Sequence, residues 1–425
     1  MRTYFFSHDS QKVFISFFLF GLLNNILYVI ILSAAIDLVG SSTPKAVVLL
    51  ADVVPSFTFK LVAPFFIHLI PYKIRLYSLI VLSSGGMLLI SSSPTNLKFL
   101  KIVGILLASL SSGMGEVSFL QLTHYYKDDA IGGFSSGTGG AGLFGSFLFM
   151  LFTNIMGIPV WIVLIFFAIT PLGFLITYQF LLPKPSHEYH AIGLNEEEEE
   201  EAEEEAEDME IELSEGGGNS SSSSSSSSNK LTAHITNTVE RIKPLVLPFM
   251  LPLTTVYISE YVINQGISPT LLFPLDNLPS WLFSSYRDIY VVYGFLYQLG
   301  VFISRSSVTF GIRIKRLYLL SILQAVNVFI TIIQSMFDLP FTSIWPLLML
   351  IFYEGLLGGS SYVNTFMSVS EQVPKSQREF SMGCVSISDG LGIVLAGCIN
   401  WWLETTLCNL QVQRGRDWCL KGDSL

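Results

Sequence analysis

Long apolar segments separated by short polar ones follow one another along almost the whole chain. A helix needs about 20 mostly apolar residues to cross a bilayer, because lipid cannot satisfy an open backbone. Eleven stretches meet this requirement. They cover approximately residues 13–38, 46–70, 76–92, 99–122, 134–156, 160–182, 244–266, 289–304, 317–336, 344–368 and 381–403. We therefore expect an all-α polytopic membrane protein.

A polar segment interrupts this pattern between the sixth and seventh spans. It contains an acidic run at 196–215, three glycines and an unbroken serine tract at 220–228. Like charges repel each other and serine buries little, so a disordered linker is expected. The chain then divides into an N-terminal transmembrane half (1–182), the acidic and Ser-rich linker (183–243), a C-terminal transmembrane half (244–403) and a tail (404–425).

The composition agrees with this division. Hydrophobic residues make up 51% of the chain and charged residues only 13%, which excludes a cytosolic enzyme. The formal net charge is -10; the linker, with 16 acidic and four basic residues, contributes -12, so the remainder sums to +2. The acidity belongs to the linker, and no nucleic-acid partner is indicated. The four cysteines lack C-x-x-C spacing, and we expect neither a metal nor a cofactor.

The distribution of Lys and Arg indicates an orientation. With a cytosolic amino terminus, cytosolic segments hold 15 of these residues and those on the far side hold 7. The positive-inside rule therefore favours a cytosolic N-terminus and linker. Eleven spans then place the C-terminus on the lumenal side, and a missed twelfth span would change only the side of the tail.

The two halves echo each other in sequence. Arg-Leu-Tyr opens the third span at 75–77 and the ninth at 316–318, an offset of 241 residues. Nearly the same offset relates Asn24 to Asn264 and Glu116 to Glu354. Matches in register indicate internal duplication. Six spans return the chain to its starting side, so the repeats would be parallel, as in major facilitator superfamily transporters, although that superfamily usually has twelve spans.

Several unusual strings occur in order along the chain. They are NNILYV at 24–29, LAD at 50–52, SSGMGEV at 111–117, SSGTGGAG at 135–142, EYVINQG at 260–266, SRSS at 304–307, YEGLLGG at 353–359, YVNTF at 362–366 and ISD at 387–389. Together they resemble the battenin family, the Batten-disease (juvenile ceroid lipofuscinosis) proteins, in its fungal form. The resemblance covers both halves and fails only in the linker and tail.

This resemblance implies a lysosomal or vacuolar membrane protein with a major-facilitator-like fold. It further implies links to organelle pH, to basic amino acid storage and to efflux of glycerophosphodiesters. One departure concerns the carboxy terminus. Animal members end in a C-a-a-X prenylation box, whereas the last cysteine here is Cys419, so carboxy-terminal prenylation is not expected.

Ionisable residues inside the spans are the first candidates for function. Each costs roughly 2.5 to 3.5 kcal/mol at membrane depth on insertion scales, so it needs a protein or water partner. Asp52 and Lys60 share the second span, about 12 Å apart in rise, with Pro55 between them. They are either part of a structural ion pair, to this or another helix, or residues that bind substrate or close a gate.

Glu116 and Glu354 occupy equivalent spans of the two halves, each beside glycines. The glycines themselves are explained by close helix packing. A carboxylate there suits either proton coupling across an acidic vacuolar membrane or a structural hydrogen bond. Both alternatives remain open from sequence alone.

Other polar residues complete the candidate set. Glu260, Asn264 and Gln265 form one polar stripe on the seventh span, which would line a central cavity opposite Asn24 and Asn25. Arg305 could clamp a phosphate or carboxylate, or snorkel to lipid headgroups. Asn364 and Asp389 lie within the strings that carry the resemblance.

The Gly-rich run at 135–142 lacks the Lys-Ser/Thr ending of a P-loop, so nucleotide binding is not indicated. No span offers a hydrolase arrangement either. The sequence therefore predicts a vacuolar transporter in the lipid bilayer, moving a small polar metabolite with protons. The alternative is a non-transporting regulator of vacuolar pH and trafficking that acts through trafficking or proton-pump partners. The segment 267–286 is expected to lie on the membrane or cap the cavity, with Trp281 at the interface.

Overall fold

Apolar runs form helices throughout the computed structural model, which describes residues 8–34, 45–94, 97–184, 225–280, 282–283, 286–416 and 418–421. Within these ranges every regular element is helical. Eight helical stretches there are long and apolar enough to cross a membrane: Asp9–Ile31, Tyr72–Ser92, Lys98–Tyr125, Val160–Leu181, His234–Thr270, Leu317–Phe337, Ile344–Gln372 and Lys375–Gln413. The expected all-α multi-pass architecture is confirmed.

The N-terminal half contains helices at each of its six expected spans. They are α1 (His8–Ser33), α3 (Lys45–Val62), α4 (Tyr72–Ser92), α5 (Lys98–Leu122), α6 (Lys127–Met150) with the π-helical η4 (Leu151–Ile155), and α7 (Val160–Ile169) with α8 (Leu172–Ile176) and the π-helical η5 (Thr177–Leu181). α1 packs along α6, and α4 packs along α5. Buried aromatic residues, among them Phe20, Phe119 and Phe134, fill the space between them.

In the part of the C-terminal half that the structure describes, five long helical segments follow one another. The first is α10 (Ser225–Leu245), the π-helical η6 (Val246–Met250), α11 (Leu251–Tyr261) and the π-helical η7 (Val262–Ile267); the others are α12 (Tyr286–Ser306), α13 (Leu317–Phe337), α14 (Ile344–Gln372), and α15 (Lys375–Val385) with α16 (Ile387–Gln413). α12 packs against α14, and α11 against α16 and α13. A second apolar core, including Ile263, Ile289 and Leu347, holds this half together.

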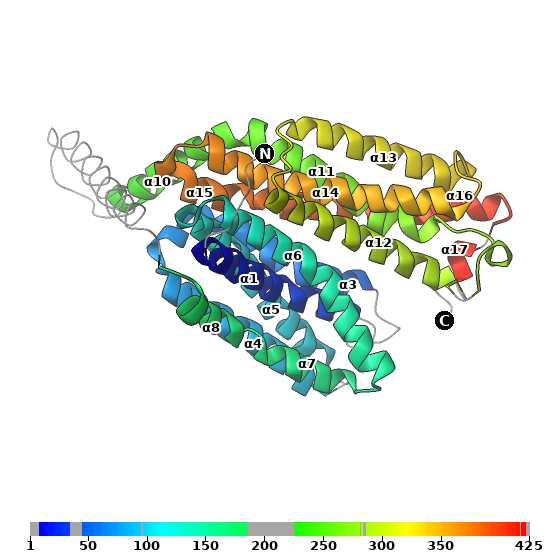
Figure 1. Ribbon diagram of the computed structural model, residues 1–425, viewed down its shortest axis with the longest axis horizontal. Coiled ribbons are helices and arrows are strands. Elements are labelled where there is room, and N and C mark those ends of the chain that lie inside the picture. Colours follow the sequence, from blue (N-terminus) through cyan, green and yellow to red (C-terminus); the bar gives the residue numbers. More distant parts are fainter. Residues whose placement is uncertain are drawn as a thin grey trace.

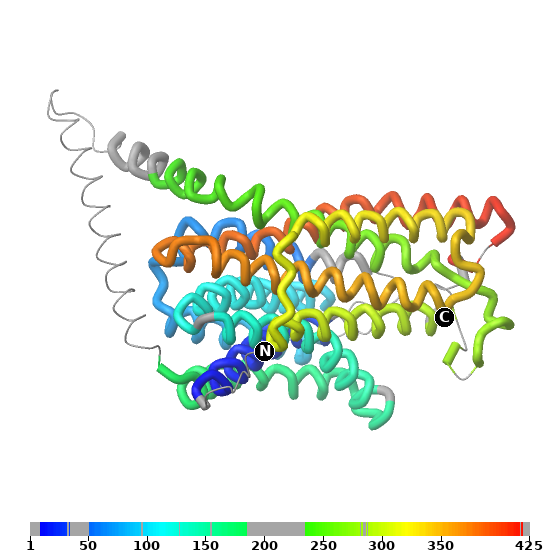
Figure 2. The backbone as a smooth tube through the Cα atoms, turned by 45° about the horizontal axis from the view of Figure 1, so that its top comes forward, coloured from blue at the N-terminus to red at the C-terminus, as the bar shows by residue number. Residues whose placement is uncertain are grey.

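The two halves lie side by side with their helices running in roughly the same direction (Figure 1). In Figure 2, after rotation, the dark-blue start of the chain lies low in the view and the red helix lies high, while the lighter blue helices reach the level of the orange ones. Across the interface, α6 contacts α12 and α14, α3 contacts α16, and α5 contacts α15. Three interface helices, α3, α6 and α12, are not among the eight apolar stretches. They carry much of the polar character of the spans and contact the other half.

The halves are tied together at the end where α10 and α15 lie, which we call the linker-side end. Tyr72 and Tyr125 of the N-terminal half donate hydrogen bonds to the Glu379 carboxylate on α15, at 2.5 and 2.6 Å. Arg241 of α10 stacks over Phe380 at 4.4 Å. The His234 ring on α10 lies 3.1 Å from the Phe65 carbonyl of the N-terminal half. These contacts close the interface at this end.

Two boundaries differ from the sequence expectation. Most of the 183–243 segment lies outside the described residues, but from Ser225 onward it forms α10 rather than a disordered chain. Its end is anchored by apolar residues such as Leu245 and Phe249, which are buried in the core. α16 also continues ten residues beyond the expected end of the last span, to Gln413, because Gln411 is buried and donates to the Thr270 and Ser335 carbonyls.

The segment after η7 is packed onto the C-terminal half. Leu271, Leu272, Phe273 and Phe283 are buried in its apolar core, so this segment is not a solvated loop. Trp281 lies outside the described residues. Close to this segment, Cys408 of α16 is disulfide-bonded to Cys419 of α17 (Trp418–Lys421).

Candidate functional site

A cavity of about 150 Å³ lies between the two halves. Its walls come from α1, α3, α5 and α6 on one side and from α11, α12, α14 and α16 on the other. Both halves therefore contribute to one space, and its walls carry ionisable side chains. The most polar of them are Asp52, Lys60, Glu116, Glu260, Arg305 and Asp389.

Lys60 is the centre of a buried charge cluster. Its Nζ atom lies 2.5 Å from Glu116 Oε2 on α5 and 2.9 Å from both carboxylate oxygens of Asp389 on α16. The three side chains are at most a tenth exposed. One cation facing two carboxylates leaves an excess negative charge, unless a proton or a ligand supplies the balance. Breaking such a buried pair by removing one partner is strongly destabilising.

The close approach of α3 and α5 has a local cause in the sequence. A Cβ atom on Gly113 would lie only 2.6 Å from the Ser56 carbonyl oxygen, so a larger residue would push these helices apart. With glycine at this position, Lys60 on α3 comes within ion-pair distance of Glu116, which is three residues after Gly113 on α5. Small residues at helix interfaces permit such backbone contact.

Tyr362 of α14 connects this cluster to Arg305. Its hydroxyl donates to Glu116 Oε1 at 3.0 Å, and the Arg305 guanidinium lies 4.2 Å from the centre of its ring. Arg305 also donates to Thr138 on α6 at 2.5 Å and to the Tyr257 hydroxyl at 3.0 Å. Arg305 therefore faces the cavity and does not snorkel to lipid headgroups, because both of its terminal nitrogens are held by these polar groups.

Two further carboxylates of the cavity lack a complete set of partners among the described residues. Glu260, 2% exposed, has no hydrogen-bond partner for Oε2. A Cβ atom on Gly358 would lie 2.7 Å from that oxygen, so this glycine makes room for the carboxylate. Asp52, 3% exposed, has no partner for Oδ2. Buried unpaired carboxylates are costly, which indicates that ligands or protons meet them.

Comparison with known proteins decides the family. Residues 15–410 match the family described as CLN3 protein. The chain belongs to the CLN3 family. It is 70% identical to Protein BTN1 of Candida albicans over 99% of this chain and all of that protein. It is 46% identical to Protein BTN1 of Saccharomyces cerevisiae, over 97% of this chain and 99% of that one.

Solved structures similar to this CLN3-family chain are major facilitator superfamily transporters. The human organic anion transporter MFSD10 matches with a TM-score of 0.53 and 13% identity, over 98% of this chain and 97% of that one. The Escherichia coli fucose:proton symporter FucP matches with a TM-score of 0.53 and 12% identity, over 97% of this chain and 94% of that one. At these identities the likeness concerns the fold. It confirms the expected major-facilitator-like architecture, and family and fold together point to a non-enzymatic membrane protein.

The structure of this CLN3-family protein gathers seven of the twelve candidate residues around the cavity. They are Asn25, Asp52, Lys60, Glu116, Glu260, Arg305 and Asp389. Asp52 and Lys60 do not pair with each other, since the partners of Lys60 are on α5 and α16. The sequence left open whether an ion pair in this span would form within the helix or with another helix. The structure shows that Lys60 pairs with other helices.

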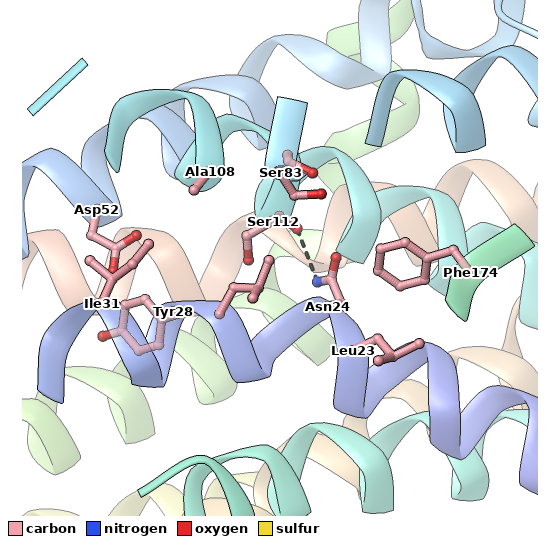
Figure 3. Close-up of a pocket in the computed structure, with 11 residues that line it drawn as sticks. Leu23, Asn24, Tyr28, Ile31, Asp52, Ser83, Ala108, Ser112 and Phe174 are labelled. Atoms are coloured by element: carbon pink, nitrogen blue, oxygen red, sulfur yellow. Dashed lines mark hydrogen bonds between the residues drawn. The ribbon is translucent and has the colours of Figure 1, made fainter. Parts of the chain in front are cut away.

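The other five candidates lie away from the cavity. Asn24 donates to the Ser112 carbonyl at 3.1 Å and lines a smaller pocket inside the N-terminal half (Figure 3). Asn264, which is half-buried, donates to Oε1 of the fully buried Glu354 at 3.0 Å, and neither residue lines the cavity. Gln265 is not among the lining residues. Asn364 accepts from Arg313 and from the Ile314 backbone, and so fixes the start of α13.

The sequence analysis did not identify the tyrosine hydroxyls of the cavity as candidate site residues. Tyr28, Tyr257, Tyr261 and Tyr362 all line it. One of them could have been found from the sequence. Tyr257 lies three residues before Glu260 and therefore on the same helix face as that candidate residue. Tyr362 had no such signal, because eight residues separate it from Glu354.

Proposed function

We propose that this CLN3-family protein is a secondary transporter that moves a small polar metabolite by alternating access around the central cavity. The observation that carries the proposal is the buried charge cluster between the halves, in which Lys60 of one half meets Asp389 of the other at 2.9 Å. A transporter of this architecture opens by moving one half against the other, so the cluster lies where that motion acts. The family and the transporter fold support this reading.

The charges of the cavity favour a substrate that carries a cationic group. Four carboxylates face two cations, Lys60 and Arg305. Arg305 supplies a planar donor group suited to a carboxylate or phosphate, and its Nε has no partner among the described residues. A zwitterionic metabolite, such as a basic amino acid or a glycerophosphodiester with a cationic head group, fits both features.

Proton linkage is proposed through the cavity carboxylates. Glu260 and Glu116 are the preferred carriers, since both line the cavity. Glu354 becomes a secondary candidate, because it does not line the cavity itself. The Asn264 amide donates both to Glu354 Oε1 and to the backbone carbonyl of Glu260, and so connects Glu354 with the cavity wall. The printed name of one structural neighbour, a fucose:proton symporter, describes such coupling in that protein.

The compartment proposed is the vacuolar membrane, with the N-terminus and linker in the cytosol and the C-terminus in the lumen. The excess of Lys and Arg on the linker side supports this orientation. A disulfide between Cys408 and Cys419 at the opposite end agrees with a lumenal location, because disulfides persist in oxidising compartments and are rare in the cytosol.

Uptake into liposomes reconstituted with the purified protein tests the proposal. A panel of cationic, zwitterionic and anionic metabolites is offered with and without an imposed pH gradient. We expect accumulation of a cationic or zwitterionic compound that is driven by the gradient and lost on Arg305→Ala. Absence of uptake for every class, with the protein correctly folded, would favour the alternative of a regulator that acts on vacuolar pH and trafficking through protein partners.

A further inference from the structure

The N-terminal half contains a second, smaller pocket lined by α1, α3, α4, α5 and α8. Its volume is about 10 Å³, which is close to the space of one water molecule. Asn24, Tyr28, Asp52, Ser83, Ser111 and Ser112 supply its polar lining. Figure 3 shows Asp52 reaching from α3 towards Tyr28 and Ile31 of α1. Asp52 also lines the central cavity, so this one carboxylate stands between the two spaces.

The pocket is rich in hydrogen-bond acceptors. The Ser83 and Ser111 hydroxyls both donate to the Leu79 carbonyl, at 2.5 and 2.9 Å. The Asn24 amide donates to the Ser112 carbonyl. The two serine hydrogens and one amide hydrogen are therefore committed elsewhere, and the oxygens of these three side chains keep free lone pairs. Asp52 Oδ2 correspondingly finds no donor among the described residues.

The hydrogen-bonded ladder of α3 is interrupted next to Asp52. Pro55 lies inside the helix and has no N–H, so the carbonyl of Ala51 loses its helical partner. Ser109 of α5 bridges the same turn, since its hydroxyl accepts from the Ser56 N–H at 3.1 Å and donates to the Asp52 carbonyl. Interrupted helices whose freed carbonyls and carboxylates meet at membrane depth are typical of coupling-ion sites in transporters.

The charge at this point is not balanced by the nearest cation. Lys60, two helical turns along α3, is bound to Glu116 and Asp389. Asp52 thus remains a buried carboxylate, 3% exposed, surrounded by neutral oxygens. From the size, the acceptor-rich lining and the single carboxylate, we infer that this pocket binds a small monovalent cation, with Na⁺ as the ion that fits. One carboxylate among neutral oxygens is a poor site for a divalent ion, which favours several charged ligands.

This inference does not depend on the identity of the transported metabolite. It is tested by ion binding to the purified full-length protein at neutral pH. Thermal unfolding is followed in about 100 mM NaCl and in KCl or choline chloride at equal ionic strength. We expect Na⁺ to raise the Tm by several degrees, and radiolabelled sodium to bind at one ion per chain.

Two substitutions locate the site. Asp52→Asn should abolish both the Tm shift and sodium binding, while Ser83→Ala, which removes a neutral oxygen, should weaken binding several-fold and covers the case in which Asp52→Asn does not fold. Asp276→Asn is the matched control, because Asp276 is exposed and lies in the other half. That control should bind sodium as the unmodified protein does.

Three results would overturn the inference. The first is a Tm that responds to pH but not to Na⁺, which would mean that Asp52 is simply protonated. The second is a Tm that does not distinguish Na⁺ from K⁺ and choline, which would mean that the pocket holds only water. The third is sodium binding that survives Asp52→Asn, which would place the ion elsewhere.

Discussion

Lys60 and Asp389 form a buried ion pair that joins residues 329 positions apart and belongs to both halves of the molecule at once. The pair lies deep in the interface, between the cavity and the contact of α3 with α16. Because Glu116 of the N-terminal half shares the same cation, Lys60 can remain paired when Asp389 moves away. In the transport cycle proposed above, Lys60 would keep a carboxylate partner while the halves separate.

Replacing Lys60 with Met should destabilise the protein strongly. Glu116 and Asp389 would then face each other without a cation, and breaking a buried pair in this way costs about 3–5 kcal/mol. Thermal unfolding in detergent measures the loss. Lys73→Met is the matched control, because Lys73 is exposed, and it should leave the Tm nearly unchanged. Equal Tm values for the two variants would show that the ion pairs of Lys60 make no net contribution to the stability of the protein.

Glu260→Gln separates proton linkage from substrate binding. Glutamine keeps the size and hydrogen bonding of the side chain but cannot carry a proton, so gradient-driven uptake should fall or lose its pH dependence. Exchange of substrate between equal concentrations should persist. Glu116→Gln should behave similarly but also lower the Tm, since Glu116 holds Lys60 and Tyr362. Unchanged pH dependence in both variants would exclude them as proton carriers.

Arg305→Lys should reduce substrate affinity although it keeps the charge. Lysine cannot donate to Thr138 and Tyr257 at once while stacking on Tyr362. A loss of one charge-assisted bond corresponds to about a tenfold rise in the apparent Kd. Concentration-dependent uptake measures it. If the lysine variant binds the substrate with unchanged affinity, only the positive charge of Arg305 contributes to substrate binding.

Glu379→Gln should loosen the linker-side end. The carboxylate accepts from both Tyr72 and Tyr125, and charge-assisted bonds of this kind contribute about 1.5–3 kcal/mol each. A cysteine placed at Ser112 in a chain without other free thiols should then react faster with an impermeant reagent added from the linker side.

The control for this experiment is Glu371→Gln. Glu371 pairs with Arg313 within the C-terminal half, at 2.8 Å, and does not bridge the halves. Its loss should not change the reactivity at position 112. If both variants accelerate labelling alike, general destabilisation rather than opening is the cause.

The disulfide between Cys408 and Cys419 can be tested by counting the free thiols of the protein. Under denaturing conditions without reductant, a maleimide reagent should modify Cys384 and Cys398 only, and after reduction it should modify all four cysteines. A protein isolated with four free thiols would contradict both the disulfide and the lumenal placement of this end. The C398S variant, with one thiol fewer, calibrates the count.

The sequence predicted the helices well, because a span leaves a long apolar run that does not depend on its neighbours. It also identified the charged residues of the cavity, since an ionisable side chain at membrane depth is conspicuous. It did not predict which charges meet. Lys60 is paired by a residue on the last long helix, and that pairing depends on how helices rotate and approach, as at Gly113.

Glu354 shows where reasoning from repeats fails. Its offset from Glu116 suggested an equivalent role, yet Glu354 faces Asn264 inside its own half. The α14 side chain that reaches the cavity is Tyr362, about two helical turns further along. Chain offset fixes the span but not the face of the helix, and the face decides the contacts.

The π-helical turns η6 and η7 at the two ends of α11 have a consequence for the ancestry of the fold. A π turn closes its hydrogen bonds over one residue more than an α turn, so each one rotates all later side chains relative to a continuous helix. The echoed residues are separated by 240, 241 and 238 positions in chain order, so the connections between the spans also differ in length between the two halves. Positions related by such an offset therefore need not share a helix face, and the two halves have to be aligned with each other helix face by helix face.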